Sequence, residues 1–429
     1  MVITYGIPEG FPRSELYAVT VNGQEAAVGH TDAADFACLA TDGPLDVEVT
    51  VASPPGTTAV RPLSRGITPS VHERRVVFRL PCPGSVSVEP EKLPPLFLFA
   101  GPPEQDPPSR SDPAVRWFGD RRVHDVGELV LQSGETLYVE GGAAMRGHVV
   151  ARQAHDVTVR GAGIIDGIGL RQRKQWRRGV LFEDCDRVRV EGVSIVNSPG
   201  WTLVFHACHG AHVAGVNEIG EGLGTDGIDV VSSRDVVVQD CFLRNGDDNL
   251  VVKAFAPAEG RGRGGDVDNV LFERCTLLGH GGCAMEIGHE LRTDEIRNVT
   301  FRDCDVLGIH GHGAAIGIHN ADHATVRDIT FESIRVEHHF TRLIDLRVIA
   351  SRYGKDSERG RIRGVRIRNV RVTSSPYNAG YTVSLIGGYD AAHDVRDVTI
   401  EGLYMDGRKA TGPDDIDLYV RHATGIEFR

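Results

Sequence analysis

The sequence predicts an all-β chain in which an N-terminal β-sandwich precedes a right-handed parallel β-helix. Three observations carry this prediction: short alternating strands near the start, a cluster of prolines after them, and a strand-like repeat through the rest of the chain. Glycine is also frequent, at 51 of 429 residues, which favours a turn-rich β architecture over a helical bundle.

Residues 1–93 are predicted to form the sandwich. Apolar and polar residues alternate over residues 16–21, 45–51 and 75–80, and turn-forming residues stand between these stretches. Alternation of this length without helical periodicity indicates strands with one buried face. Several such strands in succession are typical of two antiparallel sheets packed face to face.

A proline cluster follows the predicted sandwich. Residues 81–113 hold ten of the 21 prolines. Proline at this density interrupts both sheets and helices, so the segment 94–113 is predicted to be a linker. The β-helix is then expected over residues 114–429.

Strand-like segments recur through this second region, each with a β-branched residue near its centre. These anchors are Val157, Val188, Val213, Val236, Val270, Val299, Ile329, Val365 and Val398. Their spacing of 23–36 residues indicates a solenoid, and the segments lack runs of helix-forming residues. Strand-forming repeats favour a parallel β-helix whose rungs stack about 4.8 Å apart, with the loops between strands walling a groove.

Composition and charge exclude several classes of partner. The chain has 59 acidic and 47 basic residues, a net charge of −12, which does not suit a nucleic-acid backbone. No stretch of 18 apolar residues is present, so no membrane partner is expected. The first ten residues have neither a basic nor an apolar signal-peptide region, so a cytoplasmic location is expected unless a leader has been removed. The oligomeric state is left open.

The eight cysteines contain no Cys-x-x-Cys pair, so neither a zinc ribbon nor a thioredoxin motif is indicated. Cys185, Cys241, Cys275 and Cys304 occupy an equivalent place in the repeat. They are predicted to be small inward-facing core residues rather than disulfides. No cofactor is expected.

Closely spaced acids stand on two consecutive repeats. Asp226 lies within Gly-Thr-Asp-Gly-Ile-Asp, and Asp247 and Asp248 follow Asn-Gly. The 21 residues between Asp226 and Asp247 are close to one rung, and Gly246 allows a bend that presents both neighbouring aspartates to one side. Gathered carboxylates repel one another and can supply a general acid beside a general base. The alternative is a solvated surface with Asp-Gly turns.

Five short motifs follow one another in the second region. They are Gly-Ala-Gly-Ile-Ile-Asp-Gly at 161–167, Asn-Ser-Pro-Gly-Trp-Thr-Leu at 197–203, Thr-Asp-Gly-Ile-Asp-Val at 225–230, Asn-Gly-Asp-Asp-Asn-Leu-Val-Val-Lys at 245–253 and Gly-His-Gly-Gly at 279–282. Together they resemble the polygalacturonase family of glycoside hydrolases, family 28, and the wider clan with the dextranases, whose members carry a β-sandwich before the β-helix. The resemblance covers residues 115–405 and implies a pectin-lyase-like solenoid.

The resemblance also implies hydrolysis of a glycosidic bond with inversion of configuration. Asp247 would protonate the glycosidic oxygen, and Asp226 and Asp248 would activate the attacking water. Such a mechanism ordinarily places acid and base about 6.5–9.5 Å apart to leave room for the water.

Two departures from the family pattern concern the catalytic rungs. Gly224 stands where the polygalacturonases have Asn. His280 matches the motif histidine, which would assist the acid, whereas Cys283 takes that place if the alignment has no gap.

A third departure concerns the substrate. The Arg-x-Lys pair with which the family grips a galacturonate carboxylate falls on Ala315-Ile-Gly317. A uronate without a cation would be badly paired, so a neutral glycan is expected, as in the dextranase branch. Lys253, Arg342 and Arg347 could supply the charge from other positions.

Other polar residues are predicted to lie near the same groove. They are Glu286, His289, His319, Asn320, Asp345, Arg347, Tyr389 and Asp390. The substrate-binding set is taken as His280, Glu286, His289, His319, Asn320, Lys253 and Arg347. The histidines between residues 310 and 339 lack a helical ligand spacing, so sugar contacts or solvated loops are favoured over a metal site. The basic run 171–178 and the Gly-rich run 260–265 are expected as loops at the rim, and Trp201 either packs in the rung or stacks on a sugar.

The prediction is therefore an inverting glycoside hydrolase that acts on a neutral oligo- or polysaccharide. The alternatives are a polygalacturonase-type hydrolase of uronate glycans and a non-catalytic carbohydrate-binding β-helix. Three mutually repelling acids argue against the last, because a binding module has no use for them.

Overall fold

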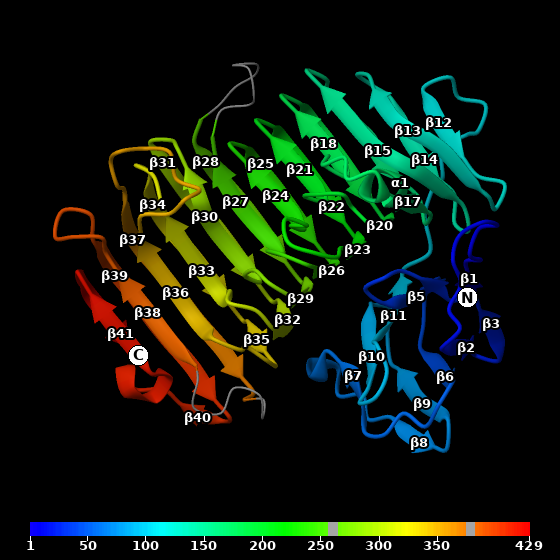
Figure 1. The fold of residues 1–429 in the computed structure, drawn as a ribbon, viewed down its shortest axis with the longest axis horizontal. Coiled ribbons are helices and arrows are strands. Elements are labelled where there is room, and N and C mark those ends of the chain that lie inside the picture. Colours follow the sequence, from blue (N-terminus) through cyan, green and yellow to red (C-terminus); the bar gives the residue numbers. More distant parts are fainter. Residues whose placement is uncertain (256–264, 375–381) are drawn as a thin grey trace.

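The computed structural model describes residues 1–255, 265–374 and 382–429. Figure 1 shows a small β domain beside a long parallel solenoid. The Gly-rich run predicted at 260–265 lies outside the described residues except for Gly265. Among the described residues, no helix is long and apolar enough to cross a membrane.

Two mostly antiparallel sheets form the N-terminal domain. The first holds β1 (Val2–Thr4), β4 (Gly29–His30), β5 (Asp35–Thr41), β7 (Thr58–Arg61), β10 (Val86–Pro90) and β11 (Leu96–Gly101). The second holds β2 (Tyr17–Val21), β3 (Gln24–Ala26), β6 (Leu45–Val51), β8 (Ser70–His72) and β9 (Arg75–Leu80), with the short 3-10 helix η1 (Leu63–Arg65) outside both. The alternation in β2, β6 and β9 places every second residue in the core between the sheets, so the predicted sandwich is confirmed.

The boundary of the sandwich differs from the prediction. The segment 94–113, expected as a linker, contains β11, which pairs in parallel with β5. Its apolar run Leu96–Gly101 follows Pro94 and Pro95 directly, and a strand can begin after a proline because only the proline itself lacks a donor. The proline-rich segment without a regular element therefore begins at Pro102.

The remaining strands form the β-helix, in which three series of parallel strands stack along the axis. The first series holds β13 (Val123–Leu131), β15 (Ala144–Arg152), β18 (Val180–Glu183), β21 (Leu203–His206), β24 (Ile228–Val231), β27 (Leu250–Ala254), β30 (Met285–Leu291), β33 (Ala314–Asn320), β36 (Arg342–Val348), β38 (Val383–Gly387) and β41 (Leu418–Arg421). The second holds β12 (Val115–Phe118), β14 (Thr136–Val139), β16 (Thr158–Arg160), β19 (Asp186–Glu191), β22 (His209–Ala214), β25 (Arg234–Gln239), β28 (Val267–Glu273), β31 (Glu295–Arg302), β34 (Thr325–Glu332), β37 (Arg361–Val372), β39 (Val395–Met405) and β42 (Ala423–Phe428). The third holds β17 (Ile164–Asp166), β20 (Ser194–Val196), β23 (Asn217–Ile219), β26 (Phe242–Asn245), β29 (Thr276–Gly279), β32 (Asp305–Ile309) and β35 (Arg335–Val336).

Three short elements complete the chain. They are the helix α1 (Ile168–Gln172), the strand β40 (Arg408–Lys409), which forms a hairpin with β39, and the 3-10 helix η4 (Pro413–Ile416). The strand order follows the chain from rung to rung, so the predicted right-handed parallel β-helix is confirmed.

The sequence repeat corresponds to a recurring corner of the rung. Asp235, Asn269, Asn298 and Asp328 each precede a buried anchor, with φ of 55°, 56°, 53° and 56°. Asn and Asp tolerate this left-handed conformation better than other residues with side chains. The polar residue of the repeat therefore turns the chain, and the anchor after it enters the core.

The inward side chains stack in register along the axis. Phe272, Phe301 and Phe331 have ring centroids 4.9 Å apart from one rung to the next and interplanar angles of 10° and 3°. Cys185, Cys241, Cys275 and Cys304 lie in the same core, as the repeat predicts. Cys38, Cys208 and Cys283 are also buried, whereas Cys82 is exposed on the sandwich.

The sandwich packs against the third series of strands. Phe97 and Phe99 of β11 contact Phe242 of β26, with ring centroids 5.0 and 5.5 Å apart. Glu337 is buried at the same boundary and accepts hydrogen bonds from the Arg61 guanidinium and the Leu63 backbone. The domains therefore share an apolar and ionic interface.

Candidate active site

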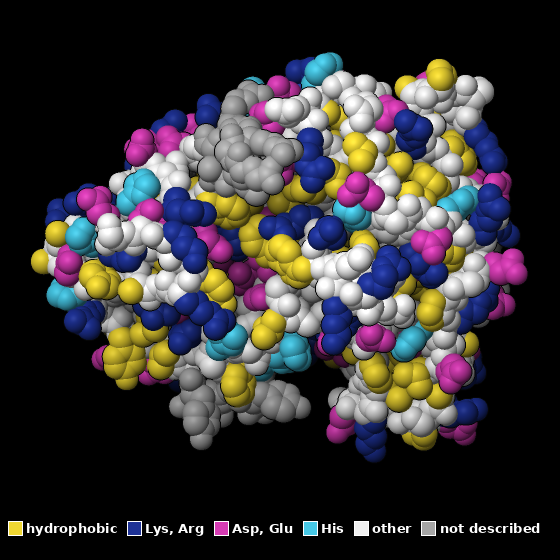
Figure 2. Space-filling view, turned by 45° about the horizontal axis from the view of Figure 1, so that its top comes forward, with side chains coloured by type: hydrophobic (Ala, Val, Ile, Leu, Met, Phe, Trp, Pro, Cys, Tyr) yellow, Lys and Arg dark blue, Asp and Glu magenta, His cyan; other side chains and the backbone are white. Residues whose placement is uncertain are grey.

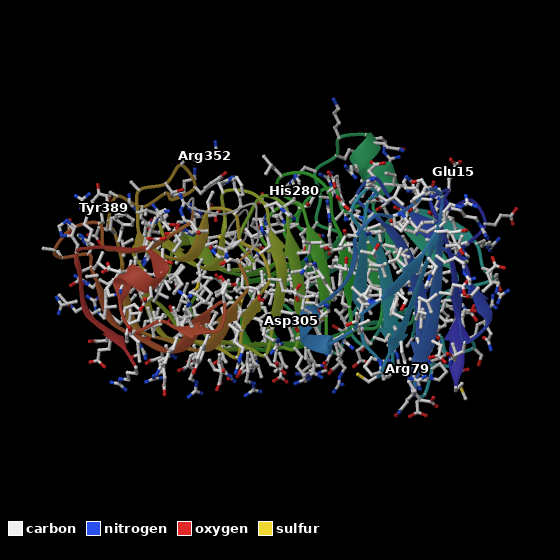
Figure 3. The ribbon with its side chains drawn as sticks, turned by 90° about the horizontal axis from the view of Figure 1, so that it is seen from below. Glu15, Arg79, His280, Asp305, Arg352 and Tyr389 are labelled. Atoms are coloured by element: carbon white, nitrogen blue, oxygen red, sulfur yellow. The ribbon has the colours of Figure 1, made fainter. Side chains whose placement is uncertain are left out.

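The first series of strands carries the site, because its outward positions gather polar residues on adjacent rungs. Asp229 on β24 pairs in register with Val251, which pairs with Glu286 on β30. Glu286 pairs with Gly317 on β33, which pairs with Asp345 on β36. The next outward position holds Lys253 on β27, His319 and Arg347. Figure 3 shows the labelled His280, Arg352 and Tyr389 along one side of the molecule and Asp305 toward the other.

Three predicted aspartates meet at the ends of these strands. One carboxylate oxygen from each of Asp226, Asp247 and Asp248 lies within 4.8 Å of the others. Gly246 makes this bend possible, because an added Cβ there would lie 2.2 Å from the Gly222 carbonyl oxygen. The structure therefore brings together the three residues that the sequence singled out.

Each aspartate has its own polar partner. The backbone N–H of Gly224 donates to Asp247 Oδ2 at 2.6 Å, and that of Cys283 donates to Asp248 Oδ1 at 2.6 Å. Lys253 Nζ donates to Asp226 Oδ2 at 3.3 Å and lies 3.8 Å from Asp229 Oδ1. The lysine is buried and partly compensates the negative charge of the cluster.

Burial changes the protonation of this cluster. It raises the pKa of Asp248 to about 7, with Glu286 contributing in the same direction. It also raises the pKa of Asp226 well above the usual value, although Lys253 opposes this. Because of the neighbouring carboxylates, the cluster can hold a proton near neutral pH, which general acid–base chemistry requires.

The oxygens of the three carboxylates approach one another closely. The nearest oxygens lie within 4.8 Å of one another, whereas the separation of about 6.5–9.5 Å in an inverting pair is measured between whole carboxyl groups. A single water can still bridge two oxygens at this separation, because each hydrogen bond spans about 2.7 Å.

A second buried network lies beside the aspartates. His319 Nδ1 is 2.8 Å from Glu286 Oε1, and His319 Nε2 is 3.1 Å from Asp345 Oδ2. Asp345 also accepts two hydrogen bonds from the Arg347 guanidinium. Burial alone would lower the pKa of His319, but Glu286 and Asp345 raise it to about 10. His319 is therefore a fixed cation between two carboxylates.

Glu286 occupies the space where residue 317 would carry a side chain. A Cβ added to Gly317 would lie 2.2 Å from Glu286 Oε2 and 3.1 Å from Cys283 Sγ. Ala315 is fully buried in the core. Neither of the positions matched to the family's cations therefore presents a charge, and a carboxylate stands at the second one.

The structure distinguishes His280 from Cys283. His280 is exposed, and its ring faces His310 at a centroid distance of 6.4 Å. Cys283 is buried, and its N–H contacts Asp248 directly. Among the residues with described positions, the His280 side chain makes no hydrogen bond or ion pair with the aspartates, so its expected role as a helper of the acid has no contact to support it.

Two further substrate-binding candidates differ in accessibility. Asn320 is fully buried and donates to the Ala324 carbonyl at 2.7 Å, so its prediction as a groove residue is wrong. Its amide closes a corner of the rung, which the sequence position alone could not distinguish from an outward one. His289 is half-buried and stacks on His319, with centroids 4.9 Å apart, so it does border the network.

Two buried acids are not among the site residues that the sequence predicts. Asp229 is fully buried, burial raises its pKa to about 7, and neither of its oxygens has a hydrogen-bond donor among the described residues. The feature of the sequence that could have identified Asp229 is its position three residues after Asp226. Glu218 points into the β-helix core and accepts from Asn245 Nδ2 at 3.0 Å, and nothing in its local sequence marks it.

Within the part of the chain that the structure describes, two groups of side chains have the composition of a metal site. They are Asp226, Asp247 and Asp248, and Cys283, Glu286 and His319. In the second group both imidazole nitrogens of His319 already face carboxylates, so neither is free to bind a metal ion. The first group is the acid cluster described above.

Comparison with known proteins identifies the family of this chain. The model of the glycosyl hydrolases family 28 matches residues 140–413, which include both rungs that carry the three aspartates. The chain belongs to glycosyl hydrolase family 28. The predicted resemblance is confirmed, and the prediction of a glycoside hydrolase is confirmed at the level of the family.

Individual curated proteins match parts of the chain. A probable polygalacturonase of Arabidopsis thaliana is 26% identical over 187 residues, which are 42% of this chain and 38% of that protein. An endo-polygalacturonase of Pectobacterium carotovorum subsp. carotovorum is 33% identical over 118 residues, 27% of each chain. The chain thus spans well under half the length of these curated relatives.

Solved structures share the architecture. Dex49A from Penicillium minioluteum superposes with a TM-score of 0.74 at 15% identity, covering 100% of this chain and 96% of that one. An exopolygalacturonase from Thermotoga maritima has a TM-score of 0.50 at 17% identity, covering 72% and 82%. At these identities the likeness concerns the fold, and the first match includes the sandwich.

Proposed function

We propose that this family 28 member hydrolyses a neutral oligo- or polysaccharide with inversion, using Asp247 as the general acid and Asp226 with Asp248 to activate water. The observation that carries the proposal is the cluster of three carboxylates within 4.8 Å on adjacent rungs. Its members have raised pKa values at Asp226 and Asp248, so protons can be exchanged there near neutral pH.

The geometry supports a division of roles. The Gly224 N–H holds Asp247 on the side of Trp176. Lys253 holds Asp226, and the Cys283 N–H holds Asp248. A water bridging Asp226 and Asp248 would lie beside the bond that Asp247 protonates. The water would add to the anomeric carbon as the bond to the leaving oxygen breaks, and its proton would pass to the pair.

The preference for a neutral sugar follows from the charges around the cluster. Glu286 fills the space at Gly317, and Ala315 is buried. Neither of the two positions that match the family's Arg and Lys therefore presents a cation. Arg347 is bound to Asp345, and Lys253 is bound to Asp226. Arg342, the third cation that could have replaced the missing pair, also lies 3.3 Å from Asp345 Oδ2, so all three are paired with carboxylates.

A polygalacturonase-type activity is the second candidate, because the curated relatives named above are polygalacturonases. Matched oligosaccharides decide between the two. Purified protein would be assayed at low salt with isomalto-, malto- and α-1,4-galacturonate oligomers of equal length, and released reducing ends would be measured. We expect a neutral series to be hydrolysed faster, and preferential cleavage of the galacturonate series would overturn the assignment.

The stereochemistry is tested on the same substrate. Proton NMR during the first turnovers should show the anomer opposite to that of the cleaved bond. A product of retained configuration, or a trapped glycosyl-enzyme, would contradict direct attack by water.

A further inference from the structure

An aromatic and cationic cluster stands next to the three aspartates. The Arg178 Cζ atom lies 4.1 Å from the ring centroid of Trp176 and 4.2 Å from that of Trp201. The two rings are 6.2 Å apart at an interplanar angle of 71°. We call Trp176, Arg178 and Trp201 the tryptophan clamp. Its guanidinium is held by both rings, so it loses little further freedom on binding.

The tryptophan clamp contacts the candidate catalytic machinery at two points. Trp176 Nε1 is 3.8 Å from the position that a Cβ of Gly224 would occupy, and the Gly224 N–H holds Asp247. Lys253 Nζ, which pairs with Asp226, lies 5.0 Å from the Trp201 ring centroid. The clamp therefore borders the space above Asp226 and Asp247. Trp176 therefore lies beside Gly224, the position at which the family 28 polygalacturonases have Asn.

The hydrogen-bonding capacity at the clamp is unused. Within residues 1–255, 265–374 and 382–429, the Arg178 guanidinium has no hydrogen-bond or ion-pair partner, although it carries five N–H donors. Both oxygens of Asp229 are buried without a donor, and the charges nearest to Asp229 include Lys253 and Arg178. Buried polar atoms are nearly always hydrogen-bonded, and in this pair only the Asp229 oxygens are buried, whereas the half-buried Arg178 can donate to solvent. Together the two residues offer acceptors and donors to the hydroxyl groups of a bound sugar.

We propose that the tryptophan clamp is a binding subsite for an uncharged sugar ring beside the scissile bond, which rests on the proposed function. The exposed part of Trp176, 51% of the residue, would stack on the C–H face of the ring. Arg178 would donate to neighbouring hydroxyl groups. A uronate fits less well, because Asp226 and Asp229 already interact electrostatically with Arg178 and would repel a further carboxylate.

Figure 2 agrees with a subsite of this kind. It shows a hollow near the middle of the β-helix face, with acidic side chains deep in it and Lys, Arg and hydrophobic side chains at its border. Mixed aromatic and polar linings of this type are typical of sites that bind small organic ligands.

Binding is tested in a protein that carries Asp247→Asn, so that hydrolysis does not intervene. Calorimetric titrations would use isomaltotriose, maltotriose and α-1,4-trigalacturonate. Trp176→Ala and Arg178→Gln are compared with Arg110→Gln, a matched control in which the exposed Arg110 lies over Trp117, 6.0 Å from its centroid, on the first rung. We expect each clamp variant to weaken binding of a neutral trisaccharide by about fivefold or more and the control to change it less than about twofold.

Kinetics separate a binding role from a structural one. In the otherwise unsubstituted enzyme, Trp176→Ala and Arg178→Gln should raise KM for the best substrate while kcat changes little. Unchanged affinity in both clamp variants, no binding of either neutral trisaccharide, or weakening confined to trigalacturonate would each overturn the subsite. The binding result does not depend on turnover, so failure of the proposed hydrolysis is seen separately in the oligosaccharide assay.

Discussion

Asp247 illustrates how one residue acquires a role from its neighbours. Its carboxylate accepts a 2.6 Å hydrogen bond from Gly224 and stands within 4.8 Å of Asp226 and Asp248. The N–H fixes the orientation of the side chain by holding its Oδ2 atom. This fixed position beside two other carboxylates makes Asp247 the candidate acid.

Replacing Asp247 by Asn should therefore lower kcat on the natural substrate by about 10²–10⁴-fold, the usual contribution of a general acid. Substrates with good leaving groups should be affected far less, because they need little protonation. Initial rates on both substrate types measure the effect. Asp106→Asn, an exposed substitution in the proline-rich segment, provides the control, and an unaffected kcat for Asp247→Asn would reject the assignment.

Glu218 supports, from inside the solenoid, the turn that carries Asp247 and Asp248. Its Oε2 accepts from Asn245, whose Oδ1 accepts from Asn249 Nδ2 at 2.9 Å, and these two asparagines flank the Asp247–Asp248 pair. Burial raises the pKa of Glu218 from 4.5 to about 8, with Asp229 adding to the effect. The carboxyl group is therefore protonated in the folded protein at neutral pH.

This protonation makes stability dependent on pH. Because the unfolded carboxyl group releases its proton above pH 4.5 while the folded one keeps it to about pH 8, stability should fall as pH rises between these values. Asp229 and Asp248, with pKa values raised to about 7, act in the same direction. Glu218→Gln should keep the fold and reduce this slope, as measured by denaturant unfolding at pH 5, 6.5 and 8. An identical slope in the variant would show that Glu218 does not titrate in this way.

At the scale of the strand, a rung is stabilised by like side chains above and below it. Phe301 lies between Phe272 and Phe331, with both centroid distances at 4.9 Å, and is fully buried. Truncation would leave a cavity that neighbouring rungs could not fill, since their backbones are fixed by hydrogen bonds.

Phe301→Ala should therefore reduce the free energy of unfolding by about 3–5 kcal/mol. Phe301→Leu keeps most of the volume and should cost about 1.5 kcal/mol or less. Chemical denaturation of both variants measures the difference. Equal stabilities of the two variants would contradict the cavity argument, because Ala leaves a larger space than Leu.

Much of this rung structure could be predicted from the sequence, and some of the site could not. The repeat of a polar residue before Val236, Val270 or Val299 reflects a local rule, a left-handed corner followed by a buried side chain, so one sequence suffices to find it. The accessibility of Asn320 and the partners of Glu218 depend on contacts between rungs, which local patterns do not encode.

The same limit explains the difference at the end of the sandwich. The prolines around Leu96–Gly101 predict a linker, whereas its apolar run pairs with a strand 61 residues earlier, as in Leu96 with Asp35. This pairing joins residues far apart in the sequence, which a local pattern does not encode.

At the scale of the whole molecule, the sandwich and the β-helix pack against each other through a shared interface. Phe242 belongs to a rung of the β-helix yet contacts Phe97 and Phe99 of the sandwich, and all three are almost fully buried. The apolar cluster there is continuous across both domains, so the two should unfold together.

Phe242→Asp would place an unpaired charge in this interface, at a cost of several kcal/mol. We expect the protein to unfold in one calorimetric transition and the variant to unfold in two, with the sandwich separating first. Phe242→Leu is the control and should keep a single transition. Two transitions already in the unsubstituted protein would show that the domains are not coupled.

The distribution of thiols has a practical consequence. Seven of the eight cysteines are buried in the rungs or at the domain boundary, whereas Cys82 is exposed on the sandwich between β9 and β10. A maleimide reagent applied to the folded protein should therefore modify one position, which lies outside the first series of strands that carries the site. A fluorophore or surface tether attached at Cys82 would hold the enzyme in a defined orientation and leave its groove open to long glycan chains.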